Sequence, residues 1–175
     1  FAASGIGMRN VGAGSISISG IPTDATILGA YLYWTILNPM APPATATFAA
    51  NPITGTLIGT SVDPCWGGVD DLENLVDAGA SWTFRADVTS YVTNPGNGSY
   101  ALSNFPSGET LMQDPFPVEG CGTFSLLPLL EGASLVIVYQ SPSEPQRDIV
   151  IYDGNAPVPD GSENNPITLN LSGFQ

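Results

Sequence analysis

The chain has 175 residues, and its 16 Asp and Glu residues face only three arginines, with no lysine and no histidine, which gives a formal net charge of −13 at pH 7. Such a surface repels phosphate backbones and anionic lipid, and no apolar stretch is as long as a membrane span. We therefore expect no nucleic-acid partner and no membrane insertion. The missing His and Lys also remove the usual general bases of serine and cysteine nucleophiles, so we expect no enzyme.

Residues 1–14 form an N-terminal extension that is rich in Gly and Ala and carries three spaced apolar side chains, Ile6, Met8 and Val11. We expect this extension not to hold itself against a core of its own chain. It suits the role of a donor strand, which adds its backbone to an open sheet edge of a neighbouring copy. Residues 15–175 are expected to form one β-sandwich domain around a single core.

Nine segments after residue 14 have the patterns of strands, and the 20 Gly and 16 Pro residues of the chain favour tight turns between them. Residues 15–21 have the pattern of a half-buried strand, with Ile16 and Ile18 on one side and Ser15, Ser17 and Ser19 on the other. Residues 25–37 are apolar on both sides and predict a central strand buried on both faces. About nine strands at this spacing predict an all-β fold, a β-sandwich or jelly roll. The other expected strands are 44–50, 56–61, 82–88, 99–102, 133–139, 148–152 and 167–171.

Short helical turns are expected at two places between the strands. Residues 69–78 carry apolar side chains at helical spacing and predict one or two turns of helix. Another turn is expected directly after residue 88, with Asp87 or Thr89 available as its N-terminal cap.

Cys65 and Cys121 are the only cysteines, and neither has the His or Cys neighbours that a zinc site needs. We expect a disulfide between them, which would stabilise the fold by about 4 kcal/mol in the chain-entropy treatment. The bond would anchor residues 106–128, the longest stretch without a strand pattern. The disulfide, the absence of lysine and the glycosylation sequons at Asn97 and Asn170 together predict an exported, extracellular protein.

Asp70, Asp71 and Glu73 are the best local cluster of acids, and carboxylates are ligands that calcium prefers. Their spacing does not match the Asp/Asn loop of strong calcium motifs, so they are a candidate site only. The same acids, with Asp148 and Asp153, are candidates for the paired carboxylates of a glycosidase. Exposed loop acids are the favoured interpretation, because nothing in the sequence brings aromatic walls of a sugar cleft together around them.

Arg85 and Asp87 share one face of their strand, and we expect a structural ion pair between them. The aromatic run Tyr31, Tyr33 and Trp34 offers a platform on which a sugar ring could stack. Because the run lies in the most apolar strand, core packing is the favoured interpretation.

Five motifs follow one another along the chain: AYLYW at 30–34, PCWG at 64–67, FRADVT at 84–89, GASLVIVY at 132–139 and RDIVIYDG at 147–154. In this order they resemble an uncharacterised family of β-sandwich modules in secreted bacterial and archaeal surface proteins. The resemblance runs from about residue 15 to the C-terminus. It implies an extracellular β-sandwich, often attached to larger adhesin-like chains, and it carries over no catalytic residue.

These features lead to two hypotheses from different functional classes. The first is an extracellular structural protein, a self-assembling filament or surface-layer subunit whose copies are joined by β-strand exchange through residues 1–14. Donor and acceptor surfaces that differ in this way build open filaments. The alternative is a secreted carbohydrate-binding or adhesion module, with calcium as its candidate cofactor. A carboxylate-based glycosidase ranks third.

Overall fold

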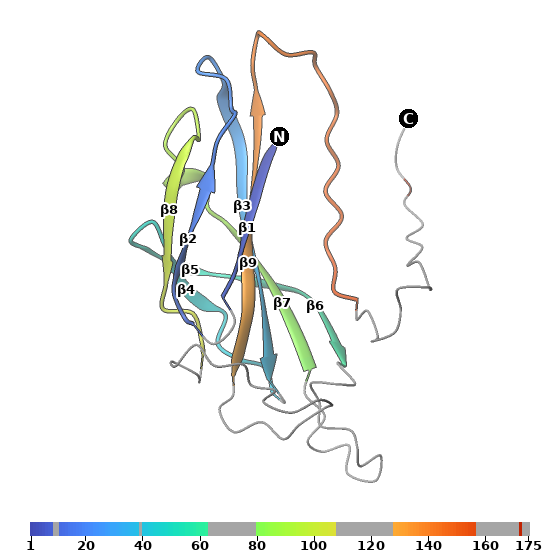
Figure 1. Cartoon of the computed structure of the whole chain (residues 1–175). Helices are drawn as coiled ribbons and strands as arrows, with labels where there is room; N and C mark the ends of the chain where they lie inside the picture. The colour runs from blue at the N-terminus through green and yellow to red at the C-terminus, as the bar shows by residue number, and fades with distance from the viewer. Residues whose placement is uncertain (9–10, 39, 63–79, 108–127, 157–171, 173–175) are drawn as a thin grey trace.

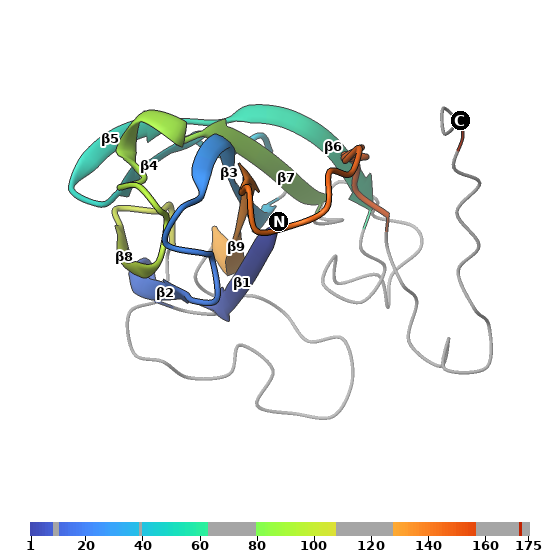
Figure 2. The ribbon, with the colours of Figure 1, turned by 90° about the horizontal axis from the view of Figure 1, so that it is seen from above.

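The computed structural model describes residues 1–8, 11–38, 40–62, 80–107, 128–156 and 172. They form nine strands in two antiparallel sheets that face each other across one core, as Figures 1 and 2 show. The predicted all-β sandwich is confirmed. No helix in the described part of the chain has the length and apolarity of a membrane span.

The larger sheet has five strands in the order β1, β9, β3, β7 and β6. Their bounds are Ala2–Gly7 (β1), Leu129–Gln140 (β9), Thr26–Asn38 (β3), Ala80–Asp87 (β7) and Thr56–Val62 (β6). The smaller sheet has the order β2, β8, β4 and β5, with bounds Gly14–Ile18, Gly98–Ser103, Thr45–Phe48 and Asn51–Thr54. A 3-10 turn, η2 (Thr89–Tyr91), follows β7 at the place where the sequence predicts a helical turn.

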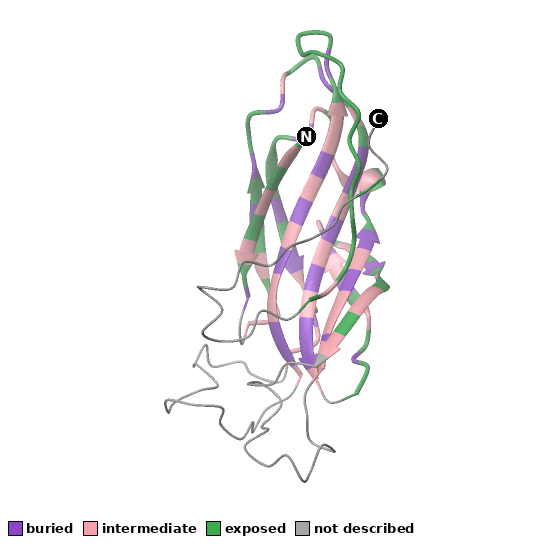
Figure 3. Cartoon of the chain, turned by 90° about the vertical axis from the view of Figure 1, so that its right-hand side faces the viewer, coloured by how far each residue is buried: buried purple, intermediate pink, exposed green. Residues whose placement is uncertain are grey.

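The core is organised around the central strand β3, whose residues alternate between buried and half-buried along the strand (Figure 3). Leu32, Trp34 and Ile36 point into the sandwich and are almost completely inaccessible to water. The Trp34 ring stacks on Phe84 with ring centroids 5.7 Å apart and meets Phe105 edge-on at 5.5 Å. Burying such large side chains provides the main driving force for joining the two sheets.

The outer face of β3 is only half-buried, so the expectation that this strand is buried on both faces is wrong. Tyr31, Tyr33 and Thr35 lie on this face with intermediate exposure. At the start of the strand a register shift lies beside Leu28, whose side chain is 59% exposed. The inner face of the large sheet therefore packs on the core, while its outer face is partly accessible to solvent, as is common for antiparallel sheets.

A two-residue turn divides the segment that the sequence analysis treats as one strand at 44–50. Ala49 and Ala50 have positive φ angles of 47° and 65°, and they connect β4 to β5 as a tight hairpin. Alanine seldom adopts this left-handed conformation, so the residues carry no sequence signal for a turn. The Asn51 amide donates to the Ala49 carbonyl at 2.8 Å and helps to hold the hairpin.

The N-terminal extension does pack against its own chain, so the contrary expectation for residues 1–14 is wrong in this structure. β1 pairs with β9 in a continuous register from Ala2 opposite Ile137 to Gly7 opposite Gly132. Met8 is 1% exposed and belongs to the core, and Ile6 packs against it. The small residues of β1 let the strand lie close to β9, while these two side chains supply enough apolar contact to anchor it.

Three other predicted elements have different outcomes. Residues 148–152 are extended but belong to no strand of either sheet, so the prediction of a paired strand there is wrong. The predicted helical turns at 69–78 and the predicted strand at 167–171 lie outside the described residues.

The close approach of β1 to β9 can be tested with two glycine substitutions. A Cβ atom on Gly132 would lie 2.6 Å from the Ile6 carbonyl oxygen, whereas a Cβ on the opposing Gly7 would meet nothing within 4 Å. Gly132→Ala should therefore lower the free energy of unfolding by about 1–3 kcal/mol, as overpacking does. Gly7→Ala is the matched control and should be nearly neutral. Equal urea midpoints for the two variants would contradict the close approach of β1 to β9 at Gly132.

Candidate functional site

A segment after β9 crosses the outer face of the five-stranded sheet, in front of the sheet in the view of Figure 3. We call residues 147–156 the strap. The strap runs in extended form and is attached to the sheet by the side chains of Asp153 and Asn155.

Asp153 fastens the strap to β3 and β7. The Tyr33 hydroxyl donates to its Oδ1 at 2.9 Å, and the Arg85 guanidinium forms an ion pair with its Oδ2. The Arg85 guanidinium also lies over the Tyr31 ring, 5.5 Å from its centroid. One cation, one carboxylate and two aromatic rings thus form a compact cluster on the outer face.

Asn155 fastens the strap to β6 and β7. Its Nδ2 donates to Thr83 Oγ1 at 2.8 Å and to Ser81 Oγ at 3.0 Å, and its Oδ1 accepts from Ser61 Oγ at 2.5 Å. The backbone approaches so closely that a Cβ on Gly59 would lie 2.8 Å from the Asn155 nitrogen. The side chain is therefore satisfied on both its donor and its acceptor side, as a half-buried amide requires.

Arg85 has a different partner from the one the sequence predicts. Its ion pair is with Asp153, while Asp87 Oδ1 accepts from the Thr89 backbone N–H at 2.9 Å and from the Thr89 hydroxyl at 2.6 Å. The Thr89 hydroxyl, followed by its N–H, lowers the pKa of Asp87, and Arg85 adds a smaller lowering. The predicted Arg85–Asp87 pair is thus wrong, because the N–H groups after β7 need an acceptor and Asp87 is the nearest carboxylate.

Asp87 accepts from Thr89, the first residue of η2, but Val88 occupies the N-terminal cap position and makes no side-chain cap hydrogen bond. The prediction that Asp87 or Thr89 caps the turn is therefore wrong, because Asp87 lies one residue before the cap position. The sequence gives no signal for Asn155, and it marks Asp153 only as a candidate acid. No local pattern marks either residue as a partner of β6, β7 or β3, because the partners are more than 65 positions away along the chain.

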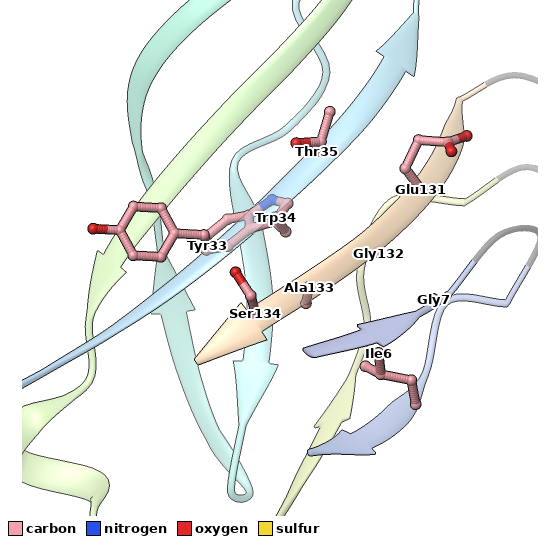
Figure 4. A pocket seen from close by; sticks show the side chains of 9 residues that line it. All are labelled: Ile6, Gly7, Tyr33, Trp34, Thr35, Glu131, Gly132, Ala133 and Ser134. Atoms are coloured by element: carbon pink, nitrogen blue, oxygen red, sulfur yellow. The ribbon is translucent and has the colours of Figure 1, made fainter. Parts of the chain in front are cut away.

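A shallow open hollow of about 390 Å³ lies beside this cluster on the outer face (Figure 4). Part of the hollow is lined by Gly7 and Gly132, which have no side chains to fill it. Tyr33, Thr35 and Ser134 also line it. Of the aromatic run, Trp34 is in the core as predicted, but the two tyrosines are on the outer face. Among the described residues that line the hollow, Tyr33 and Trp34 are the aromatic ones, and only the Tyr33 ring is on the outer face, where a ligand could meet it.

Several predicted site residues lie outside the described residues, among them Cys65, Cys121, Asp70, Asp71, Glu73 and Asn170. Their disulfide and calcium roles stay predictions. Three strand ends next to these segments, Val62, Ala80 and Leu129, lie at one end of the large sheet, because Val62 and Asn38 both pair with Ala80 and Leu37 pairs with Leu129. Within the described ranges, no group of three or more acids and cysteines is placed to hold a metal ion.

The sequon residue Asn97 has a structural partner. Its Oδ1 accepts from the Ile21 N–H at 3.0 Å, and its Nδ2 donates to the Ile21 carbonyl at 2.7 Å. The side-chain amide thus pairs with both backbone groups of Ile21, as the backbone of a neighbouring strand would. It joins the segment before β8 to the segment after β2.

Comparisons of the chain with protein-family models, with curated proteins and with solved structures give no match. The resemblance to secreted surface modules therefore stays an expectation, and the arguments below depend on the residues of this chain.

The cluster predicts opposite pKa changes for two variants. Burial and then the Asp153 carboxylate raise the pKa of Tyr33 above 10.0, while Arg85 lowers it. Asp153→Ala should therefore move the Tyr33 pKa down, and Arg85→Gln should move it up. Each titration is recorded as an ultraviolet difference spectrum against the same protein carrying Tyr33→Phe. Shifts of both variants in the same direction would show that the cluster is wrongly described.

The two hydrogen bonds that Thr89 donates to Asp87 predict a pH-dependent loss of stability. Asp87→Ala should lower the free energy of unfolding by about 1 kcal/mol near pH 7, as the loss of a hydrogen bond usually does. Because the folded state lowers the pKa of Asp87 below 3.8, its contribution is present above that value and is lost as the pH falls through the folded pKa. Urea unfolding should therefore separate wild type from variant at pH 7 and much less at pH 2.

Proposed function

We propose that this protein is an extracellular structural subunit that assembles with copies of itself into a filament or surface layer by exchanging β1. The observation that carries the proposal is the position of β1 at the end of the large sheet, where β9 is its only strand neighbour in the described part of the chain. A terminal edge strand can leave one sheet and enter the same place in another without disturbing any strand between them.

The place that β1 occupies is shaped for this strand. Gly132 leaves room for the Ile6 carbonyl oxygen, and a Cβ on Gly14 would lie 3.0 Å from the Ile6 side chain. Met8 fills a buried position in the core and its N–H donates to the Glu131 carbonyl at 2.9 Å. A β1 strand from a second copy would make these same contacts, so exchange costs no packing.

The connection after β1 supports exchange as well. The Val11 N–H donates to the Met8 carbonyl at 2.9 Å, between the end of β1 and the start of β2. β1 and β2 belong to different sheets, so β1 could extend as an arm if this hydrogen bond broke. Since the arm and the vacated edge of β9 are different surfaces, each copy both gives and receives a strand, and the arrangement continues as an open polymer.

The composition favours the same function. A chain with no lysine, few charges and many Ser, Thr, Asn and Gly residues suits a surface structure more than a catalyst. The strong negative charge opposes nonspecific association, so contacts between copies need specific apolar strands such as β1.

A pair of engineered cysteines would distinguish a strand held within one chain from an exchanged strand. Ala3 and Val136 are directly opposite each other on the outer face, at a spacing that suits a disulfide. After oxidation, a protein with Ala3→Cys and Val136→Cys should run as a ladder of covalent polymers on a denaturing, non-reducing gel. Each single variant and the wild type, which carries only Cys65 and Cys121, are the controls. Cross-linked monomers alone would contradict the proposal.

A carbohydrate-binding or adhesion module is the second candidate, and the hollow beside Tyr33 is the observation that favours it. Tyr33 would stack on a sugar ring, while the Thr35 and Ser134 hydroxyls would bind its hydroxyl groups. A chain that stays monomeric and binds an oligosaccharide, with the binding lost in Tyr33→Ala, would replace the first proposal by this one. Calcium dependence of that binding would point to Asp70, Asp71 and Glu73.

A further inference from the structure

The amide of the sequon residue Asn97 makes a two-point contact in the folded chain. Its Oδ1 accepts from the Ile21 N–H at 3.0 Å, and its Nδ2 donates to the Ile21 carbonyl at 2.7 Å. Turning the amide over would place its NH2 group against the Ile21 N–H and its oxygen against the Ile21 carbonyl, so the partners determine its orientation. Both hydrogen bonds end on one residue and therefore use the same side of the amide.

The backbone of Ile21 depends on this contact. Ile21 lies between β2 and β3, outside both strands, and belongs to the core with an exposed fraction of 3%. Buried backbone groups need hydrogen-bond partners, and here one side chain supplies a partner for the N–H and for the carbonyl. Removing the Asn97 amide from this position would leave two backbone groups without these partners.

The chain on both sides of Asn97 is held as well. The Tyr100 hydroxyl donates to the Gly96 carbonyl at 2.8 Å, and Gly96 has a φ of 104°, which favours glycine. Ser99, which completes the sequon, belongs to β8, and its hydroxyl shares a hydrogen bond of 2.6 Å with the Ser15 hydroxyl. The amide and the hydroxyl that define the sequon are thus both engaged, although both residues are exposed.

N-glycosylation would replace the hydrogen atom that this contact uses. The reaction joins Nδ2 to C1 of an activated sugar, whose phosphate or nucleotide group leaves, and one Nδ2 proton goes to the solvent. The product is a secondary amide, which prefers the trans form, with its new substituent on the same side as the oxygen. Nδ2 donates to Ile21 from that side, because Oδ1 and Nδ2 face the same residue. The sugar would therefore take the place of the donated hydrogen.

Two rearrangements could relieve this conflict, and neither is well populated. A cis amide would keep a hydrogen on the Ile21 side, but it is roughly fiftyfold less populated than the trans form. Breaking both hydrogen bonds would turn the amide to the solvent. Two hydrogen bonds of ordinary net strength keep such an open form at about a tenth of the molecules or less.

We infer that the pairing with Ile21 and an N-linked glycan exclude each other at Asn97, so that this sequon accepts a sugar only in a chain that has not folded and stays bare in the folded protein. The amide that a glycosyltransferase needs is the same amide that satisfies the Ile21 backbone. The inference concerns a modification, and it does not depend on the proposed self-assembly.

Enzymatic glycosylation of two matched sequons tests the inference. Thr54→Asn creates an Asn-Gly-Thr sequon at residues 54–56, with its acceptor exposed at the end of β5. The folded full-length variant is incubated with an N-glycosyltransferase and its activated sugar, and both sites are followed by mass spectrometry. Asn97 should be modified at least about tenfold more slowly than the new acceptor, because its amide must first open. Equal rates would overturn the inference.

An unfolded full-length chain is the reference for the two sequons. Leu32→Asp and Trp34→Asp, added to Thr54→Asn, place two carboxylates in the core and should unfold the chain, which circular dichroism checks. In this chain the rate at Asn97, relative to the rate at the new acceptor, should rise at least about tenfold. An unchanged ratio would overturn the inference, because the local sequence and not the pairing would then explain slow modification.

A charge substitution tests the role of the amide in the folded chain. Asn97→Asp keeps the acceptor for the Ile21 N–H, but it loses the donor and places a negative oxygen against the Ile21 carbonyl at pH 7. Its urea midpoint should be below that of wild type at pH 7. The difference should narrow as the pH falls, because the protonated carboxyl group can donate again. Thr54→Asp adds the same charge at an exposed position and is the control. Equal midpoints of the two variants at pH 7 would overturn the inference.

Discussion

The two-sided role of β3 is the constraint on which the rest of this structure depends. Its inner face carries Trp34, which packs against side chains from β7 and the segment after β8 and so joins the two sheets. Its outer face carries Tyr33, which binds the strap. Because successive residues of one strand point to opposite faces, a shift of β3 by one residue would remove the core and the strap contact together. The pairing of β3 with both β7 and β9 prevents that shift.

Much of the fold could be predicted from alternation alone. Strands β2, β3, β7, β8 and β9 all overlap segments with a clear apolar pattern, and each is half-buried or central as that pattern indicates. The missed strands have physical explanations. β1 consists mostly of Ala, Ser and Gly, so its alternation is invisible in hydrophobicity, and β5 is hidden because Ala49 and Ala50 form a turn without the usual Gly or Asn.

The candidate site was much less predictable than the fold. Arg85 was expected to bind Asp87 because both lie on one face of a strand. In the structure Asp87 instead accepts a hydrogen bond from Thr89 at the start of η2, and Arg85 forms its ion pair with Asp153. A pairing across 68 positions depends on where a loop returns to the sheet, and no local pattern encodes that path. The sequence did mark residues 148–152 as strand-like, but these residues lie outside the strands of the two described sheets.

Asn155 gives the strap a mechanical property. Its amide joins Ser61 on β6 to Ser81 and Thr83 on β7, beside the backbone of Gly59. A pull along the strap would stretch these bonds and the Asp153 contacts at the same moment, whereas a force that lifts the strap from its end would break them one after another. The attachment is therefore stiffest along the strap and weakest perpendicular to the sheet. Tension applied along the strap should pass through Asn155 into strands β6 and β7.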